Sequence, residues 1–192
     1  MTGLRITAGT LRGRRVPLPK RGGDLRPTSE RARQAYFNIV GPRIAGARFL
    51  DLFAGTGIFS FEAVSRGAAS SVTIDAAAAQ AMGIEQLATT WDLPVKAIRA
   101  DVLAGIKRLG DAVFDLVYAD PPYSYEGYGE LLAAIDRSVR LSAGALVAIE
   151  HRRREEPFGV PPEQLQFVRR AEYGEVWISF FATADEGPRE TS

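Results

Sequence analysis

The chain has 192 residues, of which 46% are hydrophobic and 24% are charged, and its formal net charge is +1. It contains no cysteine and one histidine, His151, which excludes disulfides, zinc–thiolate sites and a cysteine nucleophile and disfavours a multi-histidine metal site. No apolar run approaches the ~20 residues that span a bilayer, and the N-terminus lacks the apolar segment of a secretory signal. We therefore expect a cytoplasmic protein with one full core, no bound metal and no membrane partner.

The basic residues are concentrated at the N-terminus. Residues 1–43 hold ten Lys and Arg against two acids, a balance of +8, whereas the rest of the chain holds fourteen basic and twenty-one acidic residues, a balance of −7. The stretch LRITAGTLRGRRVPL alternates apolar and basic residues around glycines, as a β-hairpin does. A solvated basic tail is the plainer interpretation, but a structured basic hairpin favours a nucleic-acid partner.

Strand and helix patterns alternate along the remainder. A helix is predicted from Thr28 or Ser29, followed by strands at 48–53, 71–74, 95–99, 114–119 and 145–150 and helices at 58–65, 76–90, 103–109 and 129–139. The segment LQFVRRAEYGEVWISFFA predicts a closing antiparallel hairpin around Tyr173 and Gly174. The pattern indicates an α/β fold with a seven-stranded, mostly parallel sheet and helices on both faces, in which ligands bind beyond the carboxyl ends of the strands.

The first of these strand ends carries a glycine loop, FLDLFAGTG. Gly55 and Gly57 separate a strand from a helix, where the backbone can approach a ligand closely. Ser60 replaces the third glycine of the dinucleotide-binding pattern, and Asp51 just before the loop would repel a pyrophosphate. A carboxylate there suits a cationic ligand with a free amino group, and S-adenosylmethionine fits that description.

Acids also follow the next two strands. Asp75 lies about twenty residues after the glycine loop, where a carboxylate can bind a ribose diol, and Asp101 could accept from an adenine amine. Each of them could instead cap the helix that follows. Three acids at three successive strand ends together predict one nucleoside-shaped pocket.

The fourth strand ends in Asp120-Pro121-Pro122-Tyr123, and this motif carries the strongest signal. The exocyclic amine of a base is a poor nucleophile because its lone pair is delocalised into the ring. Two acceptors, the Asp120 carboxylate and the Pro121 carbonyl, could hold the amine hydrogens and direct the lone pair at a methyl donor. The prolines stiffen the loop, and Tyr123 could stack on the base.

DLFAGTG together with DPPY resembles the Rossmann-like S-adenosylmethionine-dependent amino-methyltransferases. RITAGTLRGRRVPLP, LRPTSERARQAYFNI, FEAVSRGA and EYGEVWISFF resemble the RsmD family of bacterial 16S rRNA guanine-N2 methyltransferases, over about residues 4–181. The resemblance implies methylation of 16S rRNA in the small ribosomal subunit, with Asp120 to Tyr123 as the catalytic motif. It implies a cofactor pocket lined by Asp51, Phe53, Gly55, Gly57, Asp75 and Asp101. It implies RNA contacts from Arg5, Arg12, Arg14, Arg15, Arg26 and Thr28. The corresponding division is a basic hairpin arm at 1–26, a methyltransferase domain at 27–182 and a disordered tail at 183–192.

Two departures and two alternatives accompany this interpretation. The family's E-x-D after the second strand is Asp75-Ala76-Ala77 here, which predicts weaker ribose binding, and Phe59 could narrow the pocket.

A DNA adenine-N6 methyltransferase shares the DPPY motif, and a catalytically weak RNA-binding assembly factor could keep the fold. The sequence leaves open whether naked RNA or the assembled subunit is the substrate. It also leaves Glu62 as either a structural or a functional acid, and a monomer is the expected state.

Overall fold

The computed structural model describes residues 3–18, 28–152, 158–159 and 162–184 of the chain. The strands are β1 (Gly3–Arg5), β2 (Arg15–Pro17), β3 (Arg48–Leu52), β4 (Ser70–Asp75), β5 (Val95–Arg99), β6 (Val113–Ala119), β7 (Arg140–Arg152), β8 (Leu165–Tyr173) and β9 (Val176–Thr183). The helices are α1 (Thr28–Val40), α2 (Ile58–Ser65), α3 (Ala78–Trp91), α4 (Val102–Ile106) and α5 (Tyr128–Ser138), with a short 3₁₀ turn at Gly41–Ile44.

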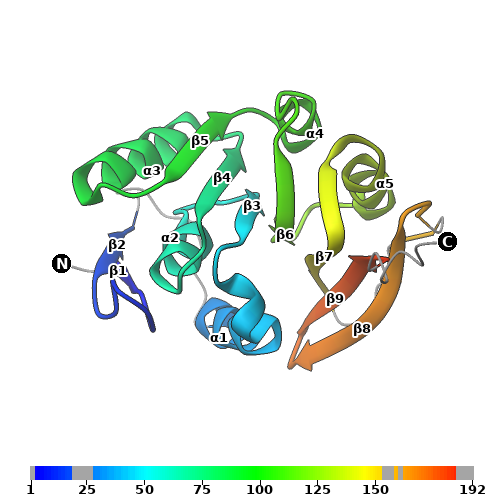
Figure 1. Ribbon diagram of the computed structural model, residues 1–192, viewed down its shortest axis with the longest axis horizontal. Helices are drawn as coiled ribbons and strands as arrows, with labels where there is room; N and C mark the ends of the chain where they lie inside the picture. The colour runs from blue at the N-terminus through cyan, green and yellow to red at the C-terminus, as the bar shows by residue number, and fades with distance from the viewer. Residues whose placement is uncertain (1–2, 19–27, 153–157, 160–161, 185–192) are drawn as a thin grey trace, which may run out of the picture.

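Seven strands form one sheet in the order β5-β4-β3-β6-β7-β9-β8 (Figure 1). The pairs from β5 to β7 are parallel, whereas β9 runs antiparallel to both β7 and β8. Strand order reverses between β3 and β6, the place where ligands bind in such sheets. The predicted α/β fold, with its mostly parallel sheet and its C-terminal antiparallel hairpin, is confirmed.

Two apolar cores lie on the two faces of the sheet. One core gathers residues of α1, α2 and α3 with the N-terminal hairpin, and the other gathers residues of α4 and α5. The central strands therefore read as nearly continuous apolar runs, because both of their faces are covered. This burial fixes the strand ends, and with them the side chains that follow each strand.

The N-terminal hairpin packs on the body. β1 and β2 pair antiparallel from Gly3↔Pro17 to Arg5↔Arg15, beside α2 and α3 (Figure 1). Ile6 and Val16 are almost fully buried in the core shared with these helices. The predicted hairpin is thus present, and its apolar side chains are core residues. The division into an arm at 1–26, a domain at 27–182 and a tail at 183–192 stays a prediction, since 19–27 and 185–192 lie outside the described residues.

Three predicted boundaries need correction. β3 ends at Leu52 because Phe53 turns into the left-handed region with a φ of 59°, which starts the glycine loop. β7 begins at Arg140, well before residue 145, and reaches its main register with β6 through an irregularity before Leu146. α4 ends at Ile106, because the next amides bond to carbonyls three residues back and continue only as turns. Among the described residues, no helix has both the length and the hydropathy needed to cross a membrane.

Candidate active site

The glycine loop is tied to the end of β4 by a carboxylate. Gly55 and Gly57 have φ values of 53° and 74°, which favour glycine, and a Cβ at Gly57 would lie 2.8 Å from Ile84. Asp75 accepts a hydrogen bond from the Gly55 amide at 2.8 Å and another from the Ala77 amide at 2.8 Å. The N-cap residue of α3 is Ala77, so Asp75 is not the N-cap that the capping alternative predicts. Asp75 instead bridges the loop and the start of the helix.

Asp51 lies beneath this loop and is 2% exposed. Its Oδ2 accepts from the Ser60 hydroxyl at 2.7 Å and from the Ser60 amide at 3.2 Å, which anchors the first turn of α2. Ser71 in turn donates to Ser60 at 2.8 Å. Burial raises the pKa of Asp51 to about 7, against the two Ser60 hydrogen bonds, and the charge of Asp75 raises it further. The serine that replaces the third glycine therefore has a definite role.

Asp101, Phe53 and Tyr125 lie near one another beyond the strand ends. Asp101 is exposed and caps α4, because its Oδ1 accepts from the Leu103 amide at 3.0 Å. The rings of Phe53 and Tyr125 meet edge to face at 5.1 Å, and burial together with the charges of Glu130 and Asp101 raises the pKa of Tyr125. The capping alternative for Asp101 is confirmed, and a cap of this kind still leaves its second oxygen for a ligand. Tyr125 is an aromatic that sequence reasoning overlooked in PPYSYEGY.

The Asp120–Tyr123 motif leaves β6 directly beside β3. The Asp120 amide donates to the Leu52 carbonyl at 3.3 Å, and the Tyr125 amide donates to the Pro122 carbonyl at 2.8 Å, which closes a tight turn. Tyr123 is 43% exposed, so its ring is available at the surface. Burial raises the pKa of Asp120 well above its usual range, and the charges of Glu150 and Asp51 raise it further.

Glu150 is an acid of the site that sequence reasoning missed. β6 and β7 pair in register as far as Ala119↔Ile149, so Asp120 and Glu150 follow side by side. The Tyr118 hydroxyl donates to Glu150 Oε2 at 2.6 Å, and burial raises the pKa of Glu150 against this hydrogen bond. The signal was present, because Glu150 stands near the carboxyl end of the fifth parallel strand just as the other acids do at theirs.

The carboxyls of Asp51, Asp120 and Glu150 thus meet at adjacent strand ends. Among the residues that the structure describes, none of them forms an ion pair. Asp51 is buried, and Asp120 and Glu150 are half-buried. These neighbouring acids are costly to ionise together, so a positively charged ligand would stabilise them. The described residues contain no group of three or more acids, histidines or cysteines arranged to hold a metal ion.

Arg152 covers part of the Asp120–Tyr123 motif. Its guanidinium lies over the Tyr123 ring at 4.2 Å from the ring centre, a cation–π contact. The cavity between Asp120, Tyr123, Glu150 and Arg152 has a volume of about 30 Å³, enough for a water molecule but not for a base. A base that stacks on the ring face covered by Arg152 would have to displace this guanidinium. Arg152 is exposed and contacts the motif through the Tyr123 ring.

The basic hairpin is held in place by Glu62. This carboxylate on α2 is fully buried and binds Arg33 of α1 at 2.8 Å, Arg66 at 2.7 Å and the Thr7 hydroxyl of the hairpin. Arg33 also donates to the Arg5 carbonyl at 2.9 Å. The structural alternative for Glu62 is therefore the one its contacts favour. We refer to Glu62, Arg33, Arg66 and Thr7 as the hairpin anchor.

Ser65 makes a second attachment. The Thr10 amide donates to its carbonyl at 2.8 Å, and the Leu11 amide donates to its hydroxyl at 2.9 Å. A Cβ at Gly9, whose φ is 80°, would lie 1.7 Å from the Ser65 carbonyl oxygen, so only glycine fits. The hairpin is thus fixed to the C-terminal end of α2.

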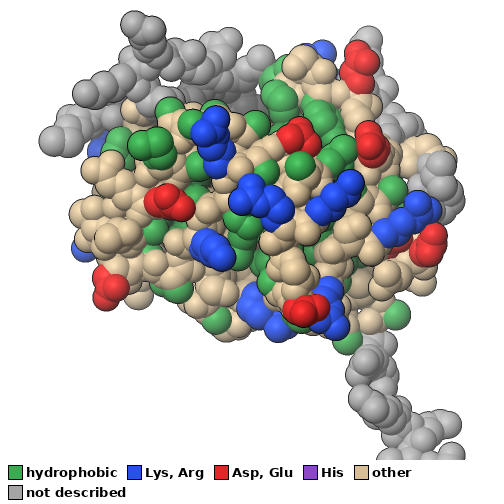
Figure 2. All heavy atoms as spheres, turned by 90° about the horizontal axis from the view of Figure 1, so that it is seen from above, with side chains coloured by type: hydrophobic (Ala, Val, Ile, Leu, Met, Phe, Trp, Pro, Cys, Tyr) green, Lys and Arg blue, Asp and Glu red, His purple; other side chains and the backbone are tan. Residues whose placement is uncertain are grey.

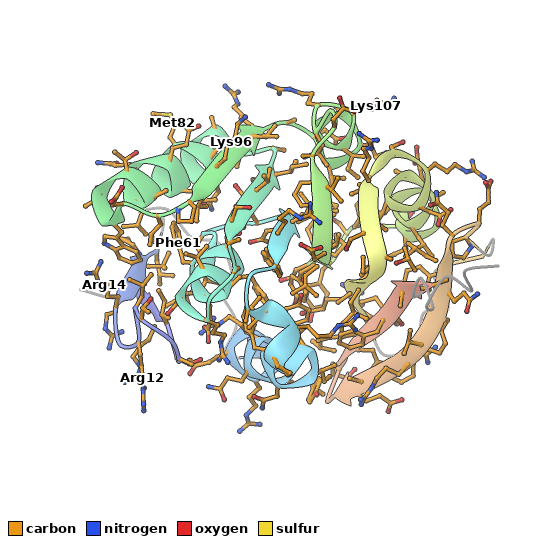
Figure 3. The ribbon with its side chains drawn as sticks, viewed as in Figure 1. Arg12, Arg14, Phe61, Met82, Lys96 and Lys107 are labelled. Carbon is orange, nitrogen blue, oxygen red and sulfur yellow. The ribbon has the colours of Figure 1, made fainter. Side chains whose placement is uncertain are left out.

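The predicted RNA-binding residues gather on this hairpin. Arg5, Arg12, Arg14 and Arg15 are all exposed, and Arg12 points away from the body (Figure 3). The Arg14 guanidinium lies over Trp91 at 5.3 Å. Arg26 lies outside the described residues, and Thr28 begins α1 with its side chain undescribed. The face over β5 and α4 is different, because its Lys and Arg side chains alternate with Asp and Glu (Figure 2).

A larger cavity of about 560 Å³ lies between the hairpin and α3. It is bounded by Val16, Pro17 and Leu18 on one side, by Ile84 and other residues of α3 on the other, and by Thr56 of the glycine loop. The hairpin therefore borders the glycine loop. The structure gathers the predicted cofactor residues around the glycine loop and places Arg5, Arg12, Arg14 and Arg15 on a separate, adjacent element.

Comparison with known proteins gives a consistent result. The model of a family described as "Conserved hypothetical protein 95" matches residues 4–182. The ribosomal RNA small subunit methyltransferase D of Escherichia coli K12 is 34% identical over 149 residues, which cover 77% of this chain and 74% of that relative. Its counterpart in Haemophilus influenzae is 30% identical over 151 residues, 77% of this chain and 78% of the relative.

Solved structures agree with this result. A structure from Escherichia coli, described as a methyltransferase, has a TM-score of 0.82 and 25% identity, over 96% of this chain and all of that one. A more distant methyltransferase, solved with S-adenosylhomocysteine, has a TM-score of 0.66 and 16% identity over 83% of this chain and 50% of the other. This second likeness shows the fold alone.

Proposed function

Since this chain belongs to the RsmD family, whose model bears the description "Conserved hypothetical protein 95", we propose that it methylates the exocyclic N2 amine of a guanine in 16S rRNA. The methyl donor is S-adenosylmethionine and the substrate is rRNA of the small ribosomal subunit. One observation carries the proposal: the Asp120–Tyr123 motif follows β6 directly beside the glycine loop that follows β3, across the point where strand order reverses.

The residues beyond β3 and β4 fit S-adenosylmethionine. The buried carboxyl of Asp51, whose pKa is raised to about 7, gains from a cationic ligand that carries an ammonium and a sulfonium. When bound, this cofactor supplies an electrophilic methyl group. Asp75 retains lone pairs for a ribose diol in addition to its two amide partners, and Asp101, Phe53 and Tyr125 offer an acceptor and two rings for adenine.

The motif itself would position the amine. Asp120 and the Pro121 carbonyl accept the two amine hydrogens, so that the nitrogen lone pair is directed toward the methyl donor. The turn closed by the Tyr125 amide holds these acceptors in place before the base arrives. The Tyr123 ring, once Arg152 has shifted, offers a flat surface for the base.

The hairpin supports an RNA substrate. Its exposed arginines form a basic surface that the anchor holds in a fixed position beside the glycine loop. Arg26 and Thr28, which the resemblance assigns to the same surface, belong to the proposal. We further propose that the protein acts as a monomer in the cytoplasm, where ribosomal subunits assemble.

Mass spectrometry of 16S rRNA tests the proposal. A strain that lacks the gene should lose one N2-methylguanosine, and the wild-type gene should restore it, whereas Asp120→Ala should not. Purified protein should transfer labelled methyl groups from S-adenosylmethionine to small subunits of the deletion strain. Methyl transfer to adenine in DNA would favour the first alternative, and RNA binding without any transfer would favour an assembly factor.

A further inference from the structure

Glu150 stands next to the group that would hold the target amine. The register Ala119↔Ile149 places Asp120 and Glu150 side by side at the end of two parallel strands. Both line the small cavity that also has Pro121 and Tyr123 in its wall. A base whose amine is bound by Asp120 would therefore present its neighbouring ring atoms to Glu150.

The Glu150 carboxylate is held in position by Tyr118. The Tyr118 hydroxyl donates to Oε2 at 2.6 Å, and the Tyr118 ring is fully buried and stacks on Phe59 at 3.9 Å. Among the described residues, no other group donates to this carboxylate, so Oε1 has acceptor capacity for a ligand. A carboxylate fixed at one oxygen and free at the other is a preorganised acceptor.

The raised pKa of Asp120 supports the proximity of these groups. Burial is the largest cause of the shift, and the charge of Glu150 is the next. The pKa of Glu150 is raised by burial as well, while the Tyr118 hydrogen bond opposes that shift. A neutral donor placed between the two carboxyls would favour their ionised forms.

The bases differ in what they offer at this place. On its Watson–Crick edge guanine has an N1–H donor directly beside the N2 amine. Adenine has an N1 acceptor beside its N6 amine. An acceptor next to the amine site would bond to guanine and face the lone pair of adenine. Leaving a buried polar group unpaired costs enough to reject the wrong base strongly.

We propose that Glu150 selects the base, by accepting the N1–H of guanine while Asp120 holds the N2 amine, and that Tyr118 is its positioning residue. The proposal rests on the proposed function, because it assigns a partner to a second edge atom of the same target base. An acceptor at Glu150 would also let the site discriminate guanine from adenine, which the Asp120–Tyr123 motif alone does not do.

The test uses small subunits reconstituted from 16S rRNA in which the methylated position, mapped with the wild-type enzyme, carries guanine or 2-aminopurine. 2-Aminopurine keeps the N2 amine but has an acceptor at N1. Wild-type protein should prefer guanine by roughly 10- to 100-fold in kcat/KM. Glu150→Gln, whose amide can donate to N1, should reduce this ratio about tenfold or more, and Tyr118→Phe should reduce it less. Glu172→Gln, an exposed acid on β8, is the matched control and should keep the wild-type ratio.

The outcomes separate the two proposals. If wild-type protein methylates no guanine, the proposed function fails before base selection is tested. If wild-type protein methylates guanine and Glu150→Gln keeps the wild-type ratio, Glu150 does not select the base. Calorimetry with S-adenosylhomocysteine provides a further check, because a Glu150→Gln variant that weakens only this binding would assign Glu150 to the cofactor and overturn the inference.

Discussion

Acids at two places in this molecule have opposite surroundings. Glu62, in the hairpin anchor, is fully buried but binds the guanidinium groups of Arg33 and Arg66 at 2.8 and 2.7 Å. Asp51, Asp120 and Glu150, at the carboxyl ends of β3, β6 and β7, form no ion pair within the described part of the chain. The fold pairs Glu62 with two cations, whereas Asp51 and Glu150 accept hydrogen bonds only from the neutral side chains of Ser60 and Tyr118 and from the Ser60 amide. A cationic or donor ligand would therefore stabilise the second set further.

We expect this difference to distinguish structural acids from functional ones. Removing a buried partner from a complete network leaves an uncompensated charge, which destabilises the protein. Neutralising an acid that has no ion-pair partner removes the free-energy cost of holding its charge in the fold. The fold should therefore tolerate such a substitution, while binding or catalysis is lost. The two groups should therefore respond to substitution with opposite effects on stability and activity.

Asp120→Ala should produce the largest effect. It removes the acceptor that we propose aligns the amine, so we expect methyl transfer to fall about 10³-fold or more. The free energy of unfolding should stay near the wild-type value or rise. Labelled methyl transfer to unmethylated small subunits and urea denaturation measure the two quantities. Near-normal transfer by Asp120→Ala would refute the assigned mechanism.

Glu62→Ala should have the converse effect. Arg33 would remain buried without its partner, and we expect the protein to lose about 3–5 kcal/mol of stability. Glu62→Gln keeps the shape and should lose less. Urea denaturation gives the free energy of unfolding, and calorimetry with S-adenosylhomocysteine on the folded fraction should show unchanged affinity. If both variants unfold like wild type, the anchor does not hold the hairpin.

Asp51→Asn should reveal a pH dependence. The folded-state pKa of about 7 exceeds the ordinary value of 3.8, so the folded protein holds a proton that the unfolded chain releases. The contribution of Asp51 to the free energy of unfolding is fully present below pH ~4 and is lost as the pH rises through 7. The free energy of unfolding of the Asn variant, measured relative to that of wild type, should therefore rise by roughly 2–4 kcal/mol from pH 5 to pH 8.

S-adenosylmethionine provides the control for this measurement. Its positive charge should favour ionised Asp51, so the pH dependence of the wild-type protein should shrink when the cofactor is present. Thermal denaturation at pH 5 and pH 8, with and without cofactor, measures both effects. A constant difference between wild type and Asp51→Asn across this range would exclude Asp51 as the titrating group.

Arg12→Ala should give the smallest effect and should leave both groups of acids untouched. Loss of one phosphate contact should lower the slope of log affinity against log salt by about 0.7 for single-stranded RNA. Lys96→Ala, an exposed cation on β5, is the matched control, and its slope should remain that of wild type (Figure 3). Filter binding to rRNA fragments at several salt concentrations measures the slope. Equal slopes for both variants and wild type would argue against RNA binding by the hairpin.

The sequence was a reliable guide to what local patterns determine. Alternating apolar runs predicted every strand of the main sheet, and the strand-end rule identified Asp51, Asp75, Asp101 and Asp120. Applied to one more strand, the same rule would have identified Glu150, so this omission was avoidable. The site roles themselves stay predictions until they are tested.

Other features depend on contacts between distant parts of the chain. Glu62 and Thr7 are 55 residues apart, and Arg33 is 29 residues from Glu62, so no spacing could show that they meet. The left-handed conformation of Phe53 follows from the loop geometry, since a phenylalanine gives no hint of a positive φ. The stacking of Arg152 on Tyr123 likewise requires β7 to end beside the turn after β6.

The docking of the hairpin also constrains the order in which the protein can fold. Ile6 and Val16 precede α2 and α3 in the chain, yet they share one core with these helices, the second of which ends at Trp91. These contacts close long loops, which makes them late events in folding and early events in local opening. During synthesis the hairpin therefore cannot complete its docking until α3 has left the ribosome. Hydrogen exchange of the Thr10 and Leu11 amides, which bond to Ser65, would follow this attachment directly.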